Sequence, residues 1–225
     1  MDYDKTRQIL KAKGDIKIEN LEENVEIFGD ELTYFINKEE IILNKNVKIN
    51  FEKNLFFNTE KILYDKTKKQ ISVNNISKFN DIFGNQISSK ESKFLLEKKI
   101  LKLRLVKMID ELNNEYHFSN AIVNFRNNEI IADGIKIDFF KGSFGNKEND
   151  PRLRGNYLSS DNNQSIIKKG VFTTCKKNSD KCPPWKLRAQ EIKHDKSKKT
   201  IYYKNAWLDL YDKPVIYFPK FFHPD

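Results

Sequence analysis

Residues 64–79, YDKTKKQISVNNISKF, decide the fold because their pattern recurs along the chain. An aromatic residue is followed by a polar turn and then by a run of residues typical of a β-strand. A recurrence every 20 to 50 residues is the sign of a repeat architecture. The aromatic residue returns about every 30 residues, as Tyr34, Tyr64, Phe94 and Phe125, and the turn returns once more at residues 195–199, DKSKK. The chain is therefore expected to repeat a unit of strand, turn and strand.

The run after each turn alternates apolar and polar residues, as in residues 106–108 (VKM) and 135–137 (IKI). A period of two sends the apolar side chains of a strand to one face and the polar ones to the other. Asp, Asn, Lys and Ser between two such runs indicate hairpins. Because a single hairpin is marginally stable, the repeats must stack. We predict an all-β chain whose repeated hairpins form a twisted β jelly-roll or V-shaped trough.

The apolar side chains of the repeats would share the interior of this trough. Two interpretations fit them on sequence: a packed sandwich core, which the residues alone favour, or the lining of a passage wide enough for lipid. Under the second interpretation the candidate lipid-binding residues are Ile16, Ile18, Val47, Ile49, Ile76, Val106, Met108, Ile135 and Ile137.

The pattern also suggests where the chain divides. Residues 1–140 carry the regular repeats, and residues 141–170 are rich in turn formers, so we expect an irregular loop there. Residues 171–225 resume the repeat and are expected to carry the last β-repeats of this chain.

Charge and hydropathy limit the kind of protein. The net charge of +9 fits an anionic partner, although compositional drift toward Lys explains it as well. Lys is spread along the chain and interleaved with 32 acidic residues, which argues against a nucleic-acid groove. The mean hydropathy of −0.71 and the lack of a long apolar run exclude a membrane-spanning helix. Residues 1–5, MDYDK, do not resemble a signal peptide, so an exported protein would have a longer precursor.

Motifs that carry chemistry are missing from the sequence. No phosphate-binding loop, paired-histidine metal motif or nucleophile elbow occurs, so we predict no enzyme activity, no cofactor and no metal. Cys175 and Cys182 are candidates for a disulfide in an oxidising compartment, and two inert thiols are the alternative.

Four segments near the carboxyl end carry a resemblance to a known family. Residues 170–175 (GVFTTC), 183–192 (PPWKLRAQEI), 199–210 (KTIYYKNAWLDL) and 214–225 (PVIYFPKFFHPD) are similar, in this order, to the end of the periplasmic domain of the LptD family. Residues 1–140 resemble only the lipopolysaccharide-transport repeat that this family shares with the bridge protein LptA (OstA-like). The specific motifs cover about a quarter of the chain.

The resemblance implies a function in outer-membrane biogenesis. The domain would lie at the periplasmic face of the outer membrane of a Gram-negative bacterium. It would receive lipopolysaccharide from an LptA-like bridge and pass it to a β-barrel, which an LptE-like lipoprotein would accompany. The family's disulfides link distant cysteines, a pattern that Cys175 and Cys182 do not reproduce within this chain.

An exposed first strand would suit such a bridge, because unpaired strand edges recruit further strands. The residues expected at this edge are Ile9, Lys11, Ile16 and Ile18. Two other classes remain open: a periplasmic β-repeat scaffold without lipid transport, and a basic β domain that binds single-stranded nucleic acid on stacked aromatic rings.

Overall fold

A computed structural model describes residues 1–51, 55–80, 84–143, 146–177 and 184–224. Strands make up 71% of the chain, and the described residues contain no α-helix. No helix in this part of the chain is long and apolar enough to cross a membrane. The prediction of an all-β chain built from sequential hairpins is confirmed. The chain divides into two compact units, Met1–Met108 and Ile109–Asp225.

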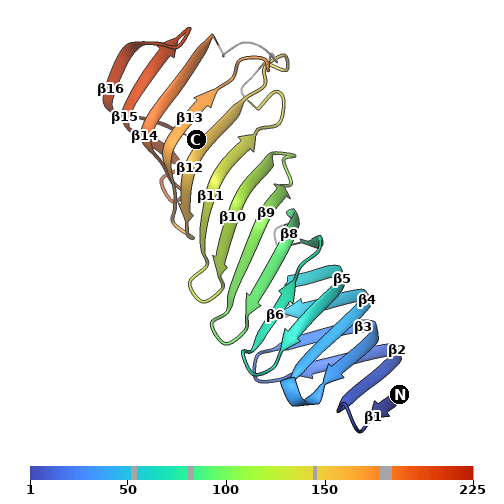
Figure 1. Ribbon diagram of the computed structural model, residues 1–225. Coiled ribbons are helices and arrows are strands. Elements are labelled where there is room, and N and C mark those ends of the chain that lie inside the picture. The colour runs from blue at the N-terminus through green and yellow to red at the C-terminus, as the bar shows by residue number, and fades with distance from the viewer. Residues whose placement is uncertain (52–54, 81–83, 144–145, 178–183, 225) are drawn as a thin grey trace. The chain divides into compact units, whose positions relative to one another are not determined.

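The first unit is an antiparallel sheet in which most neighbours in sequence are also neighbours in space (Figure 1). The strand order is β1-β2-β3-β4-β5-β6-β8-β9, and the short β7 pairs with both β5 and β8. A single 3₁₀ turn, η1 (Ile36–Lys38), joins β3 to β4. The strands are β1 (Asp2–Asp4), β2 (Ile9–Asn20), β3 (Val25–Phe35), β4 (Glu40–Phe51), β5 (Leu55–Asp65), β6 (Gln70–Val73), β7 (Ser77–Asn80), β8 (Gln86–Leu95) and β9 (Ile100–Ile109).

The second unit has the same sequential order of antiparallel strands, with longer connections at one end of the strands (Figure 1). Each strand pairs antiparallel with the next along the chain. The strands are β10 (Glu115–Asn124), β11 (Glu129–Asp138), β12 (Arg152–Ser160), β13 (Gln164–Thr173), β14 (Trp185–Asp195), β15 (Thr200–Leu210) and β16 (Lys213–Pro224).

The hairpin turns explain the regular repeat. In the turn after β5, the Asp65 carboxylate accepts a hydrogen bond from the backbone N–H of Lys68, 2.8 Å away, and Lys69 takes a left-handed conformation with φ +47°. Asp195 and Lys199 repeat this geometry in the turn after β14. A short acidic or amide side chain that accepts backbone N–H bonds stabilises such a turn. The turn residues of the repeat are therefore structural.

Consecutive turns in the first unit are also bonded to each other. Ile36 N–H donates to the carbonyl of Gln8, Lys66 N–H to Glu39, and Leu96 N–H to Lys69, over 3.0–3.1 Å. Each acceptor lies at the left-handed position of the preceding turn. These hydrogen bonds fix the spacing between consecutive turns at one end of the strands.

Most of the long strands bend in the middle. Lys45 and Asn46 in β4 have φ of +62° and +51°, and the pairing of β4 with β5 shifts register between Asn44 and Val47. Leu105 in β9 bends in the same way, with φ +50°. Such bulges redirect a strand. In the first unit they divide the sheet into two arms, one containing β6 and the other containing β7.

The two arms of the first unit touch. Phe94 pairs with Ile71 in the arm of β6, whereas Phe57 pairs with Phe79 in the arm of β7. The Phe94 and Phe57 rings nevertheless meet edge to face, with centroids 4.6 Å apart, and both rings are 1% exposed. A contact of this kind is that of a packed core.

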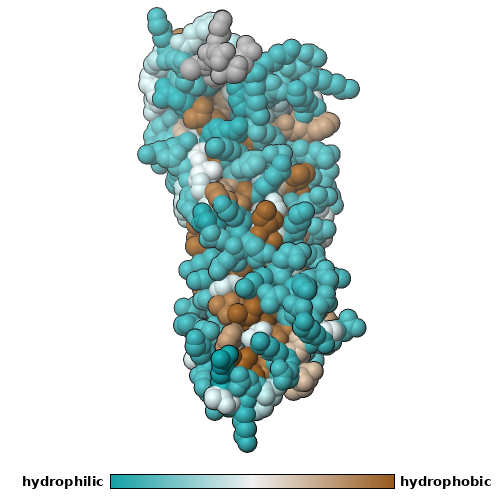
Figure 2. All heavy atoms as spheres, turned by 45° about the vertical axis from the view of Figure 1, so that its right-hand side comes forward, coloured by the Kyte–Doolittle hydropathy of each residue, from teal (hydrophilic) through white to brown (hydrophobic). Residues whose placement is uncertain are grey.

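Hydrophilic side chains cover most of the face drawn in Figure 2, and hydrophobic ones show between them in patches. The polar members of the alternating runs therefore face solvent, as period-two patterning requires.

Two predictions about organisation are wrong. Residues 141–170 do not form one irregular loop, since β12 and β13 occupy Arg152–Ser160 and Gln164–Thr173. The polar stretch between them is a tight hairpin turn, in which the Asp161 carboxylate accepts bonds from the N–H groups of Asn163 and Gln164. The unit boundary falls after Met108 and not after residue 140.

Candidate functional site

An apolar row crosses the first unit at right angles to its strands. Cα pairing in register places one residue from each of five strands in this row: Ile18, Ile27, Ile49, Phe57 and Phe79. Four of the five are at most 4% exposed, and Ile18 is half-buried because only β1, far along the strand, lies on its other side. The row is therefore shielded from solvent along most of its length and becomes partly accessible to solvent at β2, the first full-length strand.

The structure buries most of the residues predicted to line a trough. Val47, Ile49 and Val106 are 1–4% exposed, and Ile16, Ile18 and Met108 are half-buried. The prediction for Ile76 is wrong, because its side chain is 62% exposed and points away from the interior.

Ile76 lies in the link between β6 and β7 and is out of phase with the buried positions. Ile71, Val73, Ser77 and Phe79 keep one alternation across this link and face the interior, so Ile76 faces solvent. Ser77 is 0% exposed, and its hydroxyl lies 2.7 Å from that of Ser92. Thr59 lies at the same bend, where its hydroxyl donates to the carbonyl of Ile76. Sequence reasoning missed these buried hydroxyl groups.

The second unit has an equivalent apolar row. Ile135 and Ile137, both predicted for the interior, are 1% and 6% exposed. The register places seven residues across the sheet in line, namely Ala121, Ala132, Leu158, Ile167, Ile192, Tyr203 and Phe221.

Small residues line the bends of this unit. A second row contains Gly170, Ala189, Ala206 and Phe218. A Cβ atom on Gly170 would lie 2.4 Å from a methyl group of Ile192. Side chains on one side of the bend therefore pack directly over the backbone on the other.

The interior of the second unit opens toward its last strand. Phe218 and Phe221 of β16 are half-buried, and Ile216 is 47% exposed. Phe221 stacks on Tyr203, with centroids 4.3 Å apart, and burial raises the pKa of the Tyr203 phenol to about 12. This end of the row is neutral and apolar, and no described strand covers the far side of β16.

The free edges of the two terminal strands differ. Strand β1 covers only Ile9, Leu10 and Lys11 of β2, so the rest of β2 presents a free edge within the described residues. This edge carries no proline, whereas β16 contains Pro214, Pro219 and Pro224. Prolines lack the N–H donor that strand addition needs. Of the residues predicted for the partner edge, Ile9 and Lys11 are not available, because they pair with Asp4 and Asp2 of β1, whereas Ile16 and Ile18 lie on the part of β2 whose far side no described strand covers.

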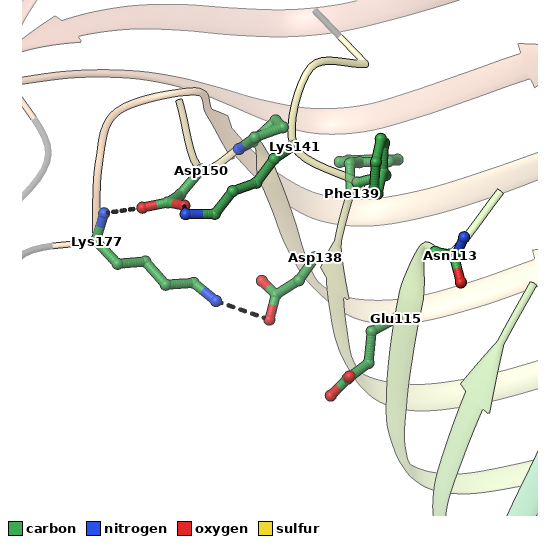
Figure 3. Close-up of a pocket in the computed structure, with 9 residues that line it drawn as sticks. Asn113, Glu115, Asp138, Phe139, Lys141, Asp150 and Lys177 are labelled. Atoms are coloured by element: carbon green, nitrogen blue, oxygen red, sulfur yellow. Dashed lines mark hydrogen bonds and ion pairs between the residues drawn. The ribbon is translucent and has the colours of Figure 1, made fainter. Parts of the chain in front are cut away.

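A polar cavity of about 270 Å³ lies in the second unit, beside the long loop between β11 and β12 (Figure 3). Four of its charged groups, Asp138, Lys141, Asp150 and Lys177, pair with one another, and the fifth, Glu115, contacts His117. Lys177 Nζ lies 3.0 Å from Asp138 Oδ2, and Lys141 Nζ lies 3.0 Å from Asp150 Oδ1. The backbone N–H of Lys177 also donates to Asp150 over 2.8 Å.

The pKa values of both carboxyl groups follow from this pairing. Burial opposes ionisation of Asp138, but hydrogen bonds from Arg154 and Lys177 outweigh it and hold the pKa below its usual range. The backbone N–H of Lys177, then Lys141, lowers the pKa of Asp150. Two acids and two lysines that neutralise each other fix a loop and leave little charge for a ligand. Sequence reasoning missed this cluster, because its members come from three separate segments.

Cys175 is half-buried, and its thiol donates a long hydrogen bond of 3.7 Å to the carbonyl of Trp185. Cys182 lies outside the described residues, so the disulfide between the two stays a prediction. Within the part of the chain that is described, no group of three His, Cys, Asp or Glu side chains could hold a metal ion.

Comparison of the chain with models of protein families finds no match, and a search of curated proteins finds no significant relative. The site must therefore be interpreted from its own geometry.

Proposed function

We propose that the protein binds the acyl chains of lipopolysaccharide and transfers this glycolipid between an LptA-like bridge and an outer-membrane β-barrel, at the periplasmic face of that membrane. The observation that carries the proposal is the apolar row of each unit, which runs across the strands to a strand whose far side no described strand covers at that level. Here the first row ends on half-buried Ile18 and the second on half-buried Phe221.

The energetics of an acyl chain suit such a row. Each buried CH₂ group contributes about 0.8 kcal/mol, so a chain entering between the arms would be held strongly without a specific pocket. A row that continues from strand to strand lets the chain advance by short steps, each of which exposes little apolar area. The free edge of β2 supports the LptA-like partner, since from residue 12 onward no described strand pairs with the side of β2 that faces away from β3.

A closed scaffold is the second candidate function. The contact between Phe57 and Phe94 favours it, because the arms of the first unit leave no lipid-sized gap at that level. The two candidates differ in whether lipid can separate the arms.

Site-specific photo-crosslinking distinguishes these candidates. Small diazirine amino acids placed at the interior positions Val47, Val106 and Ile135 should capture lipopolysaccharide. Matched positions on the outer face of the same strands, Lys48, Lys102 and Lys136, should not, since these side chains are exposed.

Circular dichroism should first establish that each labelled protein remains folded. Lipopolysaccharide from which both the ester-linked and the amide-linked acyl chains have been removed serves as the ligand control and should lose the interior crosslinks. Equal labelling of both sets, or labelling of neither set by intact lipopolysaccharide, would contradict the proposal and favour the scaffold.

A further inference from the structure

The outer face of β15 and β16 carries a patch that differs from the rest of the second unit. Cross-strand register places three pairs of residues side by side along the two strands. The patch, which we term the edge patch, contains Tyr202 and Phe222, then Lys204 and Lys220, then Trp207 and Tyr217.

Aromatic rings dominate the two ends of the edge patch. Trp207 and Tyr217 lie 4.8 Å apart between centroids and are 38% and 44% exposed. Tyr202 and Phe222 lie 5.8 Å apart, and Phe222 is 68% exposed. Large exposed aromatic groups gathered on one surface mark an interaction site.

The centre of the edge patch is cationic. Lys204 and Lys220 face each other across the strands, and no ion pair involves either of them among the described residues. Glu191 is the cross-strand neighbour of Lys204, but its carboxylate contacts Lys168. Like charges directly opposite each other destabilise a sheet. Two unneutralised lysines therefore indicate an anionic partner at this place.

We propose that the edge patch rests on the surface of an anionic lipid bilayer. Tyr and Trp concentrate at the boundary of lipid and water, where the ring is buried and the polar tip remains hydrated. The lysines would meet the lipid phosphates while their aliphatic stems lie beside the rings. The site lies on the outer face of the strands, so it does not depend on lipid carriage in the interior.

A single-stranded nucleic acid would also bring phosphates, but the ring geometry fits it less well. Base stacking needs an open ring face. In the edge patch each ring packs on its cross-strand neighbour, and only parts of the rings remain accessible. The prolines of β16 likewise disfavour a partner that adds a strand to this edge.

Vesicle binding tests the proposal on the full chain. The probe is vesicles of phosphatidylcholine and phosphatidylglycerol, compared with phosphatidylcholine alone. Sedimentation should show binding to the anionic vesicles that weakens as salt is raised. The double variant Lys204→Gln/Lys220→Gln should bind about 30-fold more weakly, as expected for two lysines near such a surface. The control Lys102→Gln/Lys136→Gln removes two exposed lysines elsewhere and should bind normally.

Trp207 reports the contact directly. In a Trp185→Phe background Trp207 is the single tryptophan, because the chain has two. Its emission should shift to shorter wavelength on anionic vesicles and should be quenched by brominated lipid. Trp207→Ser/Tyr217→Ser in the native background should lose vesicle binding and keep the strand-rich circular dichroism spectrum.

Three results would overturn the proposal. The first is vesicle binding that the edge-patch variants do not change. The second is stronger binding to a single-stranded oligonucleotide than to vesicles at the same salt. The third is a dimer, seen by size exclusion, that Trp207→Ser/Tyr217→Ser abolishes.

Discussion

Replacing Val106 by Asp tests whether the interior of the first unit is a dry core. Val106 is 4% exposed and follows the bend at Leu105, where β9 enters its second arm. Removing the buried valine side chain costs about 1.5 kcal/mol or more. An ionised carboxylate without a partner in the same place costs about 3 kcal/mol in addition. We expect the free energy of unfolding at pH 7 to fall by about 5 kcal/mol, a large share of the stability of an ordinary domain.

The pH dependence of the stability of Val106→Asp shows whether the introduced carboxyl group is buried. Burial raises the pKa of the introduced carboxyl above the value of about 3.9 that Asp has in the unfolded chain. The unfolded state therefore loses its proton first as the pH rises. The free energy of unfolding of Val106→Asp should therefore stay close to that of a neutral variant below pH 4. It should fall below that of the neutral variant as the pH rises through the folded-state pKa of the introduced carboxyl group.

Urea unfolding at pH 4 and pH 7, followed by circular dichroism, measures both effects. Val106→Asn is the neutral control of nearly equal size, and Lys102→Asp places the same charge on an exposed position of β9. A loss below about 1 kcal/mol at pH 7, with no pH dependence relative to Val106→Asn, would refute the dry core. Water would then reach Val106, as an open trough requires.

Two further predictions concern the bends and the turns. Gly170→Ala should lower the free energy of unfolding by about 2 kcal/mol, because the new methyl group would overlap Ile192 in a packed interior. A thermal melt measures the loss. An unchanged melting temperature would mean that the backbone at the bend adjusts without cost. Asp65→Asn should destabilise the protein at neutral pH only: the hydrogen bond from the Lys68 side chain lowers the pKa of Asp65, so the native advantage is present above the unfolded-state pKa and disappears as the pH falls through the folded-state pKa. Chemical unfolding across that pH range measures the difference, and a constant difference would contradict the ion-pair explanation.

The hairpin architecture was predictable because its signals are local. Asp65 and Asp195 mark their turns by accepting hydrogen bonds from backbone N–H groups three residues away. Alternation over a few residues fixes the face of a strand without reference to the rest of the chain. Both signals survive in a sequence that lacks Gly and Pro at most of its turns.

The bends were not predictable. Lys45, Asn46 and Leu105 adopt positive φ without being glycine, so composition gives no warning of the change in direction. The error at Ile76 has another cause, since Ile76 lies in the link between β6 and β7 and is out of phase with the buried Val73, Ser77 and Phe79. In the second unit, the turn-rich composition around Asp161 concealed that a single tight turn suffices there.

The candidate site was predictable only in part, because whether its interior is open or closed depends on contacts between residues that are distant in sequence. The sequence identifies apolar residues such as Val47 and Ile135 for the interior, and these are buried. It contains no local signal that Phe57 and Phe94 would meet across the arms. The edge patch likewise depends on the register between β15 and β16, which brings Lys204 opposite Lys220.

A closed interior is compatible with lipid carriage on energetic grounds. An empty trough would hold apolar walls in water, at about 25 cal/mol for each Å² exposed, so a lipid-free protein is expected to close. When an acyl chain enters, contacts between the walls are exchanged for contacts between wall and chain, and both kinds are apolar. The net cost of opening is then set by bending at positions such as Leu105 and Gly170, and by the loss of ring contacts such as Phe57–Phe94. In each unit, entry from the half-buried end of its row avoids separating the whole interior at once, so an acyl chain would first meet Ile18 in the first unit and Phe221 in the second.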